Sequence, residues 1–116
     1  MPSKKSPYVT VVVKVRTARR KTTIKLSKDP VHVSVSRKQH VVWQADGGDI
    51  EIRFTRRDTP WAHGAYAFSA PWDARCTSGP ARKDSIRKKA YKYTITVTNP
   101  ETGECALLDP GVVIED

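Results

Sequence analysis

Hydrophobic and polar residues alternate along most of this chain, a pattern that puts successive side chains on opposite faces of a β-strand. The longest run covers residues 8–17, where every second residue from Val9 to Val15 is a valine. After a break, the alternation resumes over residues 21–28, with lysine and threonine opposite the apolar positions. Together the two segments predict a β-hairpin over residues 8–28 that has one apolar face and one basic face.

The same alternation returns in several later segments, which are separated by turn residues such as Asp-Pro, Gly-Gly and Asn-Pro. It predicts strands over residues 31–36, 40–44, 50–54, 91–98, 104–108 and 112–114, and a shorter one near residues 65–69. The rest of residues 55–80 is interrupted too often by proline and glycine for long strands, and residues 84–90 alone fit a short helical turn. Eight or nine short strands without a long helix predict an all-β, antiparallel sandwich or barrel.

The size and composition suit one soluble domain with a single core, since the chain has 116 residues, 38% hydrophobic and 28% charged. We expect a flexible N-terminus over residues 1–7, a basic β-hairpin over residues 8–28 and a β-sandwich domain over residues 29–116. No apolar run reaches the roughly 18 residues of a membrane helix. The run Val9–Val13 is also shorter than a signal-peptide core of about 7–15 residues. The expected location is therefore cytoplasmic.

Positive charge is concentrated at the start of the chain. The formal net charge is +9, and nine lysines and arginines precede the first acid, Asp29, while the remaining residues hold as many bases as acids. A concentrated basic segment attracts polyanions such as nucleic acid, and a second basic cluster covers residues 82–89. The candidate polyanion-binding residues are Lys14, Arg16, Arg19, Arg20, Lys21, Lys25, Arg87, Lys88 and Lys89.

The basic hairpin has three interpretations. Lysine and arginine on the outer face of an edge strand prevent edge-to-edge aggregation, although nine bases without an acid exceed that need. Polyanion binding explains the excess, but only Tyr8 supplies an aromatic ring among the bases, and no recognition helix is evident. The valine face also needs a cover, either from the rest of the fold or from a second chain through strand addition. The partner is then a polyanion or another protein, and the chain is a monomer or a strand-mediated dimer.

A series of landmarks follows Pro30 in a characteristic order. Alternating valines, Val41-Val42-Trp43, a Gly-Asp turn and Ile50-x-Ile52-x-Phe54 come first, then Ser78-Gly79-Pro80, Tyr91-Lys92-Tyr93 and Asp109-Pro110-Gly111. This order covers roughly three quarters of the chain and resembles the cupredoxin-like family, most closely small bacterial members without the copper ligands. The resemblance implies an antiparallel Greek-key β-sandwich, to which the basic hairpin is an N-terminal addition.

The copper ligands of that family are missing from this chain. A blue-copper site needs two histidines and a thiolate, usually with a long axial methionine. The resemblance places the first histidine near Ile50 and the cysteine near Ile95, and no histidine follows His63. We therefore expect no copper, no other cofactor and no electron transfer.

The remaining candidate ligands and nucleophiles are scattered. His32, His40, His63, Cys76 and Cys105 have no zinc-like spacing. Arg75 beside Cys76 favours a thiolate, but no catalytic motif accompanies it. The cysteines are most simply free thiols, or the sole pair for a disulfide in an oxidising compartment. The sequence therefore predicts a non-enzymatic binding or scaffolding module, with polyanion binding as the alternative.

The aromatic residues divide into two groups. Trp43 and Phe68 are expected in the core, because a small sandwich needs large apolar side chains between its sheets. Trp61 and Trp72 each lie beside a proline in an irregular segment. For these two, burial and exposure both remain open.

Overall fold

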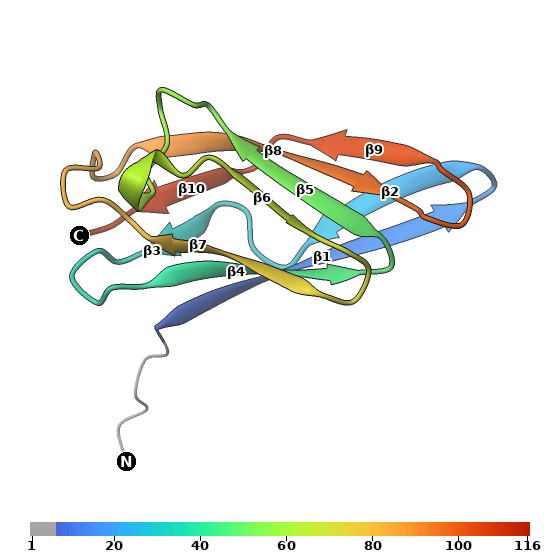
Figure 1. The fold of residues 1–116 in the computed structure, drawn as a ribbon, viewed down its shortest axis with the longest axis horizontal. Coiled ribbons are helices and arrows are strands. Elements are labelled where there is room, and N and C mark those ends of the chain that lie inside the picture. Colours follow the sequence, from blue (N-terminus) through green and yellow to red (C-terminus); the bar gives the residue numbers. More distant parts are fainter. Residues whose placement is uncertain (1–6) are drawn as a thin grey trace, which may run out of the picture.

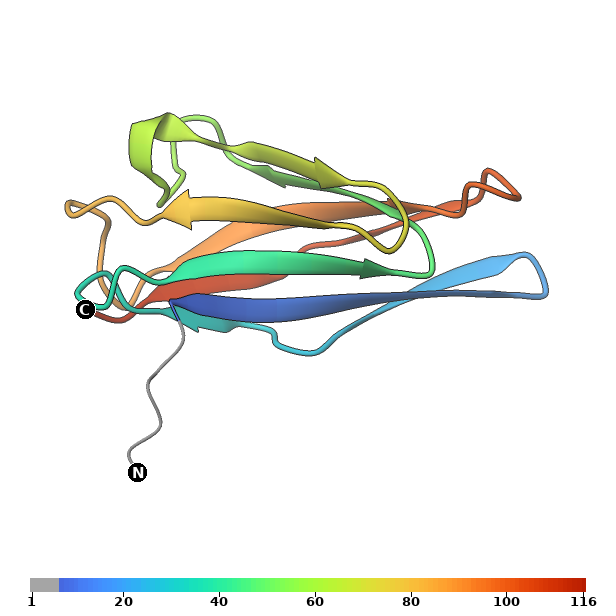
Figure 2. The same ribbon diagram turned by 60° about the horizontal axis from the view of Figure 1, so that its bottom comes forward.

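The computed structural model describes residues 7–116, which form two β-sheets packed face to face (Figures 1 and 2). The strands are β1 (Tyr8–Ala18), β2 (Lys21–Leu26), β3 (Val31–Val33), β4 (His40–Asp46), β5 (Asp49–Phe54), β6 (Ala67–Ala70), β7 (Arg75–Pro80), β8 (Ala90–Thr98), β9 (Cys105–Leu108) and β10 (Gly111–Ile114), with a short 3-10 helix, η1 (Ala62–Gly64), before β6. The predicted all-β sandwich is confirmed. The expected flexible segment, residues 1–7, lies outside the described residues except for Pro7.

The strand order mixes parallel and antiparallel neighbours. The first sheet has the order β2-β1-β4-β7, and the second has the order β3-β10-β8-β5-β6, with β9 on the C-terminal half of β8. Two pairs, β1 with β4 and β3 with β10, are parallel, so the wholly antiparallel arrangement expected from the sequence is wrong. The reason is the connection: the chain leaves β2 for the second sheet at β3 and returns as β4, and such crossovers join parallel strands.

Strand β1 is an interior strand of the first sheet, hydrogen-bonded to β2 on one side and to β4 on the other. Its inward valines, Val11, Val13 and Val15, are at most 2% exposed and belong to the main core. The valine face is therefore covered by the chain itself, and no second chain is needed to bury it.

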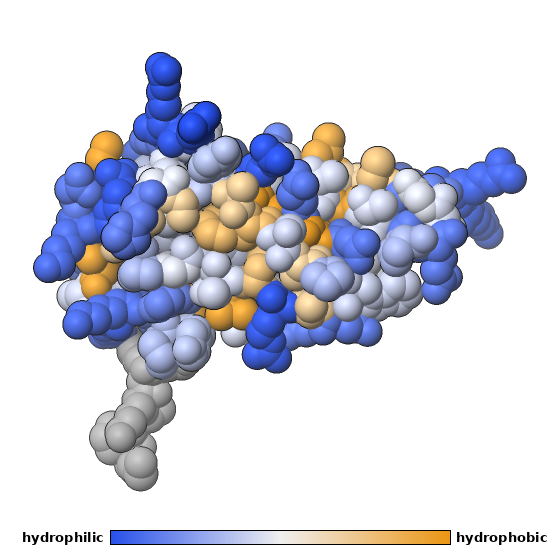
Figure 3. Space-filling model, viewed as in Figure 1, coloured by the Kyte–Doolittle hydropathy of each residue, from blue (hydrophilic) through white to orange (hydrophobic). Residues whose placement is uncertain are grey.

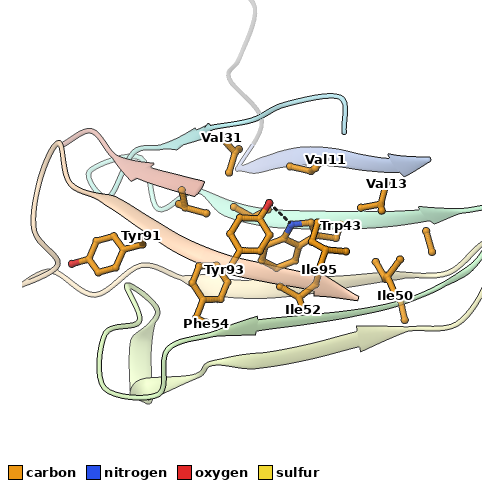
Figure 4. Packing of buried hydrophobic residues seen from close by; sticks show 14 of the residues in the cluster. Val11, Val13, Val31, Trp43, Ile50, Ile52, Phe54, Tyr91, Tyr93 and Ile95 are labelled. Carbon is orange, nitrogen blue, oxygen red and sulfur yellow. Dashed lines mark hydrogen bonds between the residues drawn. The ribbon is translucent and has the colours of Figure 1, made fainter. Parts of the chain in front are cut away.

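Four aromatic rings lie against Trp43 in the core, those of Phe54, Trp61, Phe68 and Tyr93. Figure 4 shows Trp43 with Phe54 and Tyr93. The Trp43 indole N–H donates a 3.3 Å hydrogen bond to the hydroxyl of Tyr93, and burial raises the pKa of Tyr93 to about 12, so this hydroxyl stays neutral. Trp61 is fully buried against Trp43, whereas Phe68 is half-buried and Trp72 is 39% exposed. The burial expected for Trp43 is confirmed, and that expected for Phe68 is only partial. Of the two tryptophans left open, Trp61 is buried and Trp72 is exposed.

Strand β7 and the segment after it differ from the sequence prediction. β7 forms on the edge of the first sheet although its sequence, RCTSGP, has no apolar alternation. An edge strand tolerates its terminal glycine and proline, and the Ser78 hydroxyl accepts a hydrogen bond from the Val41 backbone N–H at 3.0 Å. Residues 84–90 form turns rather than the expected helical turn.

Candidate polyanion interface

The outer face of the first sheet carries most of the basic side chains of β1 and β2. Because side chains alternate along a strand, the residues between the buried valines of β1 point away from the core. The exposed bases of this basic face are Lys14, Arg16, Lys21, Lys25 and Arg75 on the strands, and Arg19 and Arg20 in the β1–β2 turn. Among the residues of β1, β2, β4 and β7, the only acid is Asp46.

Arg16 ties this face to the turn between β4 and β5. Its guanidinium donates to the carbonyl of Val15 at 2.8 Å and to the carbonyl of Asp46 at 3.3 Å, and lies 3.4 Å from the Asp46 carboxylate. Gly47 makes this approach possible, since a Cβ at its positive φ of 96° would lie 2.3 Å from the Val15 carbonyl oxygen. Arg16 therefore has a structural role as well as a charge.

Lys14 and Lys25 are direct cross-strand partners on the basic face. Both side chains are exposed, and like charges placed directly opposite each other in an antiparallel pair are destabilising. Lys14 thus has a like charge, Lys25, beside it on β2 and an acid, Asp46, beside it on β4. An anionic ligand that bridges the two ammonium groups would relieve this repulsion.

The β1–β2 turn adds two arginines in a conformation that arginine rarely adopts. Arg19 and Arg20 have φ values of 52° and 63°, the left-handed region that two-residue hairpin turns usually fill with Asn-Gly. The turn projects from the right-hand end of the sandwich in Figures 1 and 2, and its surface is hydrophilic in Figure 3. Two charges are thus held at the end of the molecule at a cost in backbone energy.

Replacing this turn by Arg19→Asn with Arg20→Gly is expected to stabilise the fold by about 1 kcal/mol, because the strain at both positions is relieved. Chemical denaturation measures the change. The Arg19→Lys, Arg20→Lys variant keeps both the charges and the strained backbone, so its stability should match that of the original chain. An Asn-Gly variant no more stable than the double-lysine variant would contradict the strain.

The second basic cluster lies at the other end of the sandwich, next to the C-terminus (Figures 1 and 2). Lys88 contacts Glu115 at 2.7 Å, and Lys89 contacts Asp58 at 2.5 Å and covers the ring of Tyr91. The Arg87 guanidinium donates to backbone carbonyls of its own loop. The structure therefore brings together Lys14, Arg16, Arg19, Arg20, Lys21 and Lys25, and places Arg87, Lys88 and Lys89 apart from them.

Glu115 links this second cluster to strand β3. Its carboxylate accepts a hydrogen bond from the Lys88 ammonium and contacts the His32 ring. These two partners, Lys88 first, lower the pKa of Glu115.

Because folding lowers this pKa, the ionised Glu115 carboxylate stabilises the folded chain when the pH is above the ordinary value of 4.5. This stabilisation is lost as the pH falls through the lower pKa of the folded state. We expect Glu115→Gln to be less stable than the original chain at pH 7, with the gap narrowing below about pH 4.5. Urea denaturation across this range measures the gap, and a gap independent of pH would contradict the linkage.

The other candidate ligands do not converge. Within residues 7–116, no group of three or more His, Cys, Asp or Glu side chains is placed to hold a metal ion. At the copper-ligand positions implied by the resemblance, Ile50 and Ile95 are 3% and 0% exposed and belong to the hydrocarbon core. These residues do not fit a copper ion.

The two cysteines are free thiols in different surroundings. Cys76 is half-buried, and burial raises its pKa to about 11. The prediction that Arg75 favours a Cys76 thiolate is therefore wrong, because the neighbouring residue on a strand points to the other face. Cys105 is exposed at the start of β9.

Alkylation should separate these thiols. At pH 8, roughly one Cys76 side chain in a thousand is a thiolate, which makes it nearly inert in the folded chain. We expect iodoacetamide to modify one thiol per folded chain, at Cys105, and both thiols after denaturation, as counted by mass spectrometry. Cys105→Ser should remove the reaction of the folded chain. Equal rates at both cysteines would contradict the burial of Cys76.

Comparisons of the chain with protein-family models, with curated proteins and with solved structures found no match. Across residues 7–116, the structure contains no helix with the length and apolar character needed to cross a membrane.

Arg75 is a member of the basic face that sequence reasoning missed. It lies in β7, whose residues show no strand pattern, and pairs in register with Gln44 of β4. No periodic signal could have placed it, because its position depends on which strand neighbours β4.

Proposed function

We propose that this protein is a non-enzymatic binding module that holds an extended polyanion on its basic face. The observation that carries the proposal is the composition of that face: five exposed bases on one side of the sheet and two more in the β1–β2 turn, with Asp46 as the only acid in the four strands. Such a field concentrates anions at the surface. No further chain is needed to cover the first sheet, since its opposite side is buried in the sandwich.

Edge protection accounts for only part of this charge. β2 is an edge strand of the first sheet, and Lys21 and Lys25 on it would discourage pairing with another sheet. Lys14 lies on β1, which has neighbours on both sides, and Arg19 and Arg20 lie in the turn. These positions protect no edge. They favour a basic platform over a charged edge guard.

The expected affinity follows from the number of phosphates that the face can neutralise. Each contact releases condensed counterions, so about five or six contacts give micromolar, salt-dependent binding without sequence preference. The repulsive Lys14–Lys25 pair and the strained turn both reduce the stability of the free chain. A function that requires the positive charge explains why the chain retains both destabilising features.

Fluorescence anisotropy across a salt series tests this proposal. The probe is a fluorescein-labelled single-stranded oligonucleotide about 16 nucleotides long, near the upper site size of a single binding domain. We expect a dissociation constant in the micromolar range at about 50 mM salt and a linear fall of log affinity with log salt. The absence of binding at low salt would overturn the proposal.

We also propose that the sandwich is a copper-free variant of the cupredoxin-like class. The order of landmarks after Pro30 supports the class, and the buried Ile50 and Ile95 support the loss of copper. Metal analysis and visible absorbance after incubation with copper test this part. Stoichiometric bound copper or a blue absorption band would overturn it.

A further inference from the structure

A shallow depression of about 520 Å³ lies on the outer face of the first sheet, at the opposite end of β1 from the turn. Its lining residues are Tyr8, Thr10, Val42, Arg75, Cys76 and Thr77. Val42, only 8% exposed, forms its apolar floor, while Tyr8 is 55% exposed and Arg75 is exposed beside it. The depression therefore combines an aromatic ring, an apolar floor and one cation.

These surfaces suit a planar heterocycle attached to an anionic group. The Tyr8 ring offers an aromatic surface for stacking, and its edge-on contact with the His40 ring, at 5.8 Å between centroids, holds its orientation. The hydroxyls of Thr10 and Thr77 can exchange hydrogen bonds with the edge of a base. The Arg75 guanidinium can pair with a phosphate.

The depression and the basic residues form one continuous path along β1. Tyr8, Thr10, Lys14 and Arg16 all lie on the same side of this strand, and Tyr8 and Lys14 are about 20 Å apart along it. Outward residues follow one another about every 6.7 Å, close to the phosphate spacing of an extended single strand. A polymer with both bases and phosphates can therefore occupy the aromatic end and the basic end together.

We infer that the depression is a base-binding subsite and that the ligand of the basic face is single-stranded nucleic acid. This inference rests on the proposed function, since the phosphates must lie on the basic face. In a duplex, the bases are already stacked and cannot reach Tyr8, so a duplex contacts the face through phosphates alone. Sheet-surface aromatic residues that stack unpaired bases are an established mode of single-strand recognition.

Fluorescence anisotropy with three labelled probes of equal length tests the inference: a single-stranded oligonucleotide, its abasic analogue and its duplex. Base stacking is typically equivalent to a factor of about five to 150 in affinity. We expect the single strand to bind at least fivefold more tightly than the abasic analogue, and Tyr8→Ala to remove this difference without changing the abasic affinity. Trp72→Ala, at another exposed ring that does not line the depression, should leave the difference unchanged.

Each other outcome has a defined meaning. Equal affinity for the single strand and the abasic analogue, a difference that survives Tyr8→Ala, or a Tyr8→Ala loss of affinity as large for the duplex as for the single strand would overturn the base subsite and leave polyanion binding intact. Failure of all three probes to bind at low salt would overturn the proposed function itself. Thermal unfolding tests whether Tyr8→Ala is folded. Tyr8→Phe, which keeps the ring, should retain the preference for the single strand over the abasic analogue.

Discussion

Reversing Lys14 and Lys25 together, as Lys14→Glu with Lys25→Glu, is expected to weaken oligonucleotide binding at least tenfold. Removing two phosphate contacts lowers the salt slope by about 1.4 for a single strand, which at about 0.1 M salt corresponds to a factor near 25. The new carboxylates add repulsion to this loss. Anisotropy titrations at several salt concentrations measure both the affinity and the slope.

The matched control carries the same charge change at the other end of the sandwich. Arg57→Glu with Lys83→Glu alters two exposed bases outside the basic face, so its salt slope should match that of the original chain. Equal loss of affinity in both double variants would mean that net charge, rather than the basic face, determines binding.

A single Lys25→Glu change should in addition stabilise the free chain by about 0.2–1 kcal/mol, because it replaces a repulsive cross-strand pair by an attractive one.

Removing the central ring of the core should have the largest effect on stability. Trp43 is fully buried, contacts four other aromatic rings and donates its indole N–H to Tyr93. We expect Trp43→Ala to lower the free energy of unfolding by about 3–5 kcal/mol, since it leaves a large cavity and an unpaired hydroxyl. Urea denaturation followed by circular dichroism measures the change.

Trp72 provides the control for this substitution. It is 39% exposed in the connection between β6 and β7, so Trp72→Ala should change the free energy of unfolding by no more than about 0.5 kcal/mol. Tyr93→Phe should have an intermediate effect of about 1–3 kcal/mol, because it leaves the Trp43 N–H buried without its acceptor. Comparable losses for Trp43→Ala and Trp72→Ala would contradict the packing of the core.

The period-two pattern predicted most strands because burial on one face requires alternation, and it predicted the inward valines of β1 for the same reason. It could not predict which strands are neighbours. Nothing in the residues of β1 distinguishes pairing with β4 from pairing with a different strand, so the parallel pairs were missed. The same limit applies to the basic face: the charges of β1 and β2 follow from sequence proximity, whereas Arg75 joins them only through the pairing of β4 with β7.

The separation of the two basic clusters was also beyond the sequence. Lys14 and Lys88 both lie in basic stretches of the sequence. Lys88 contacts Glu115 because the C-terminus lies at the end of the sandwich opposite the β1–β2 turn (Figure 1). Charge counts along a chain do not show such pairs. Within the described residues, Asp84, Glu115 and Asp58 pair with Arg82, Lys88 and Lys89 of the second cluster, whereas on the basic face only Arg16 pairs with an acid, Asp46.

Lysine footprinting with and without a bound oligonucleotide tests the central claim most directly. Lysines are acetylated at low salt in the free chain and in the complex, and mass spectrometry measures the reactivity of each. We expect protection of Lys14, Lys21 and Lys25 in the complex, with unchanged reactivity at Lys83 and Lys92. Protection at Lys83 and Lys92 with full reactivity at Lys14 and Lys25 would contradict this claim.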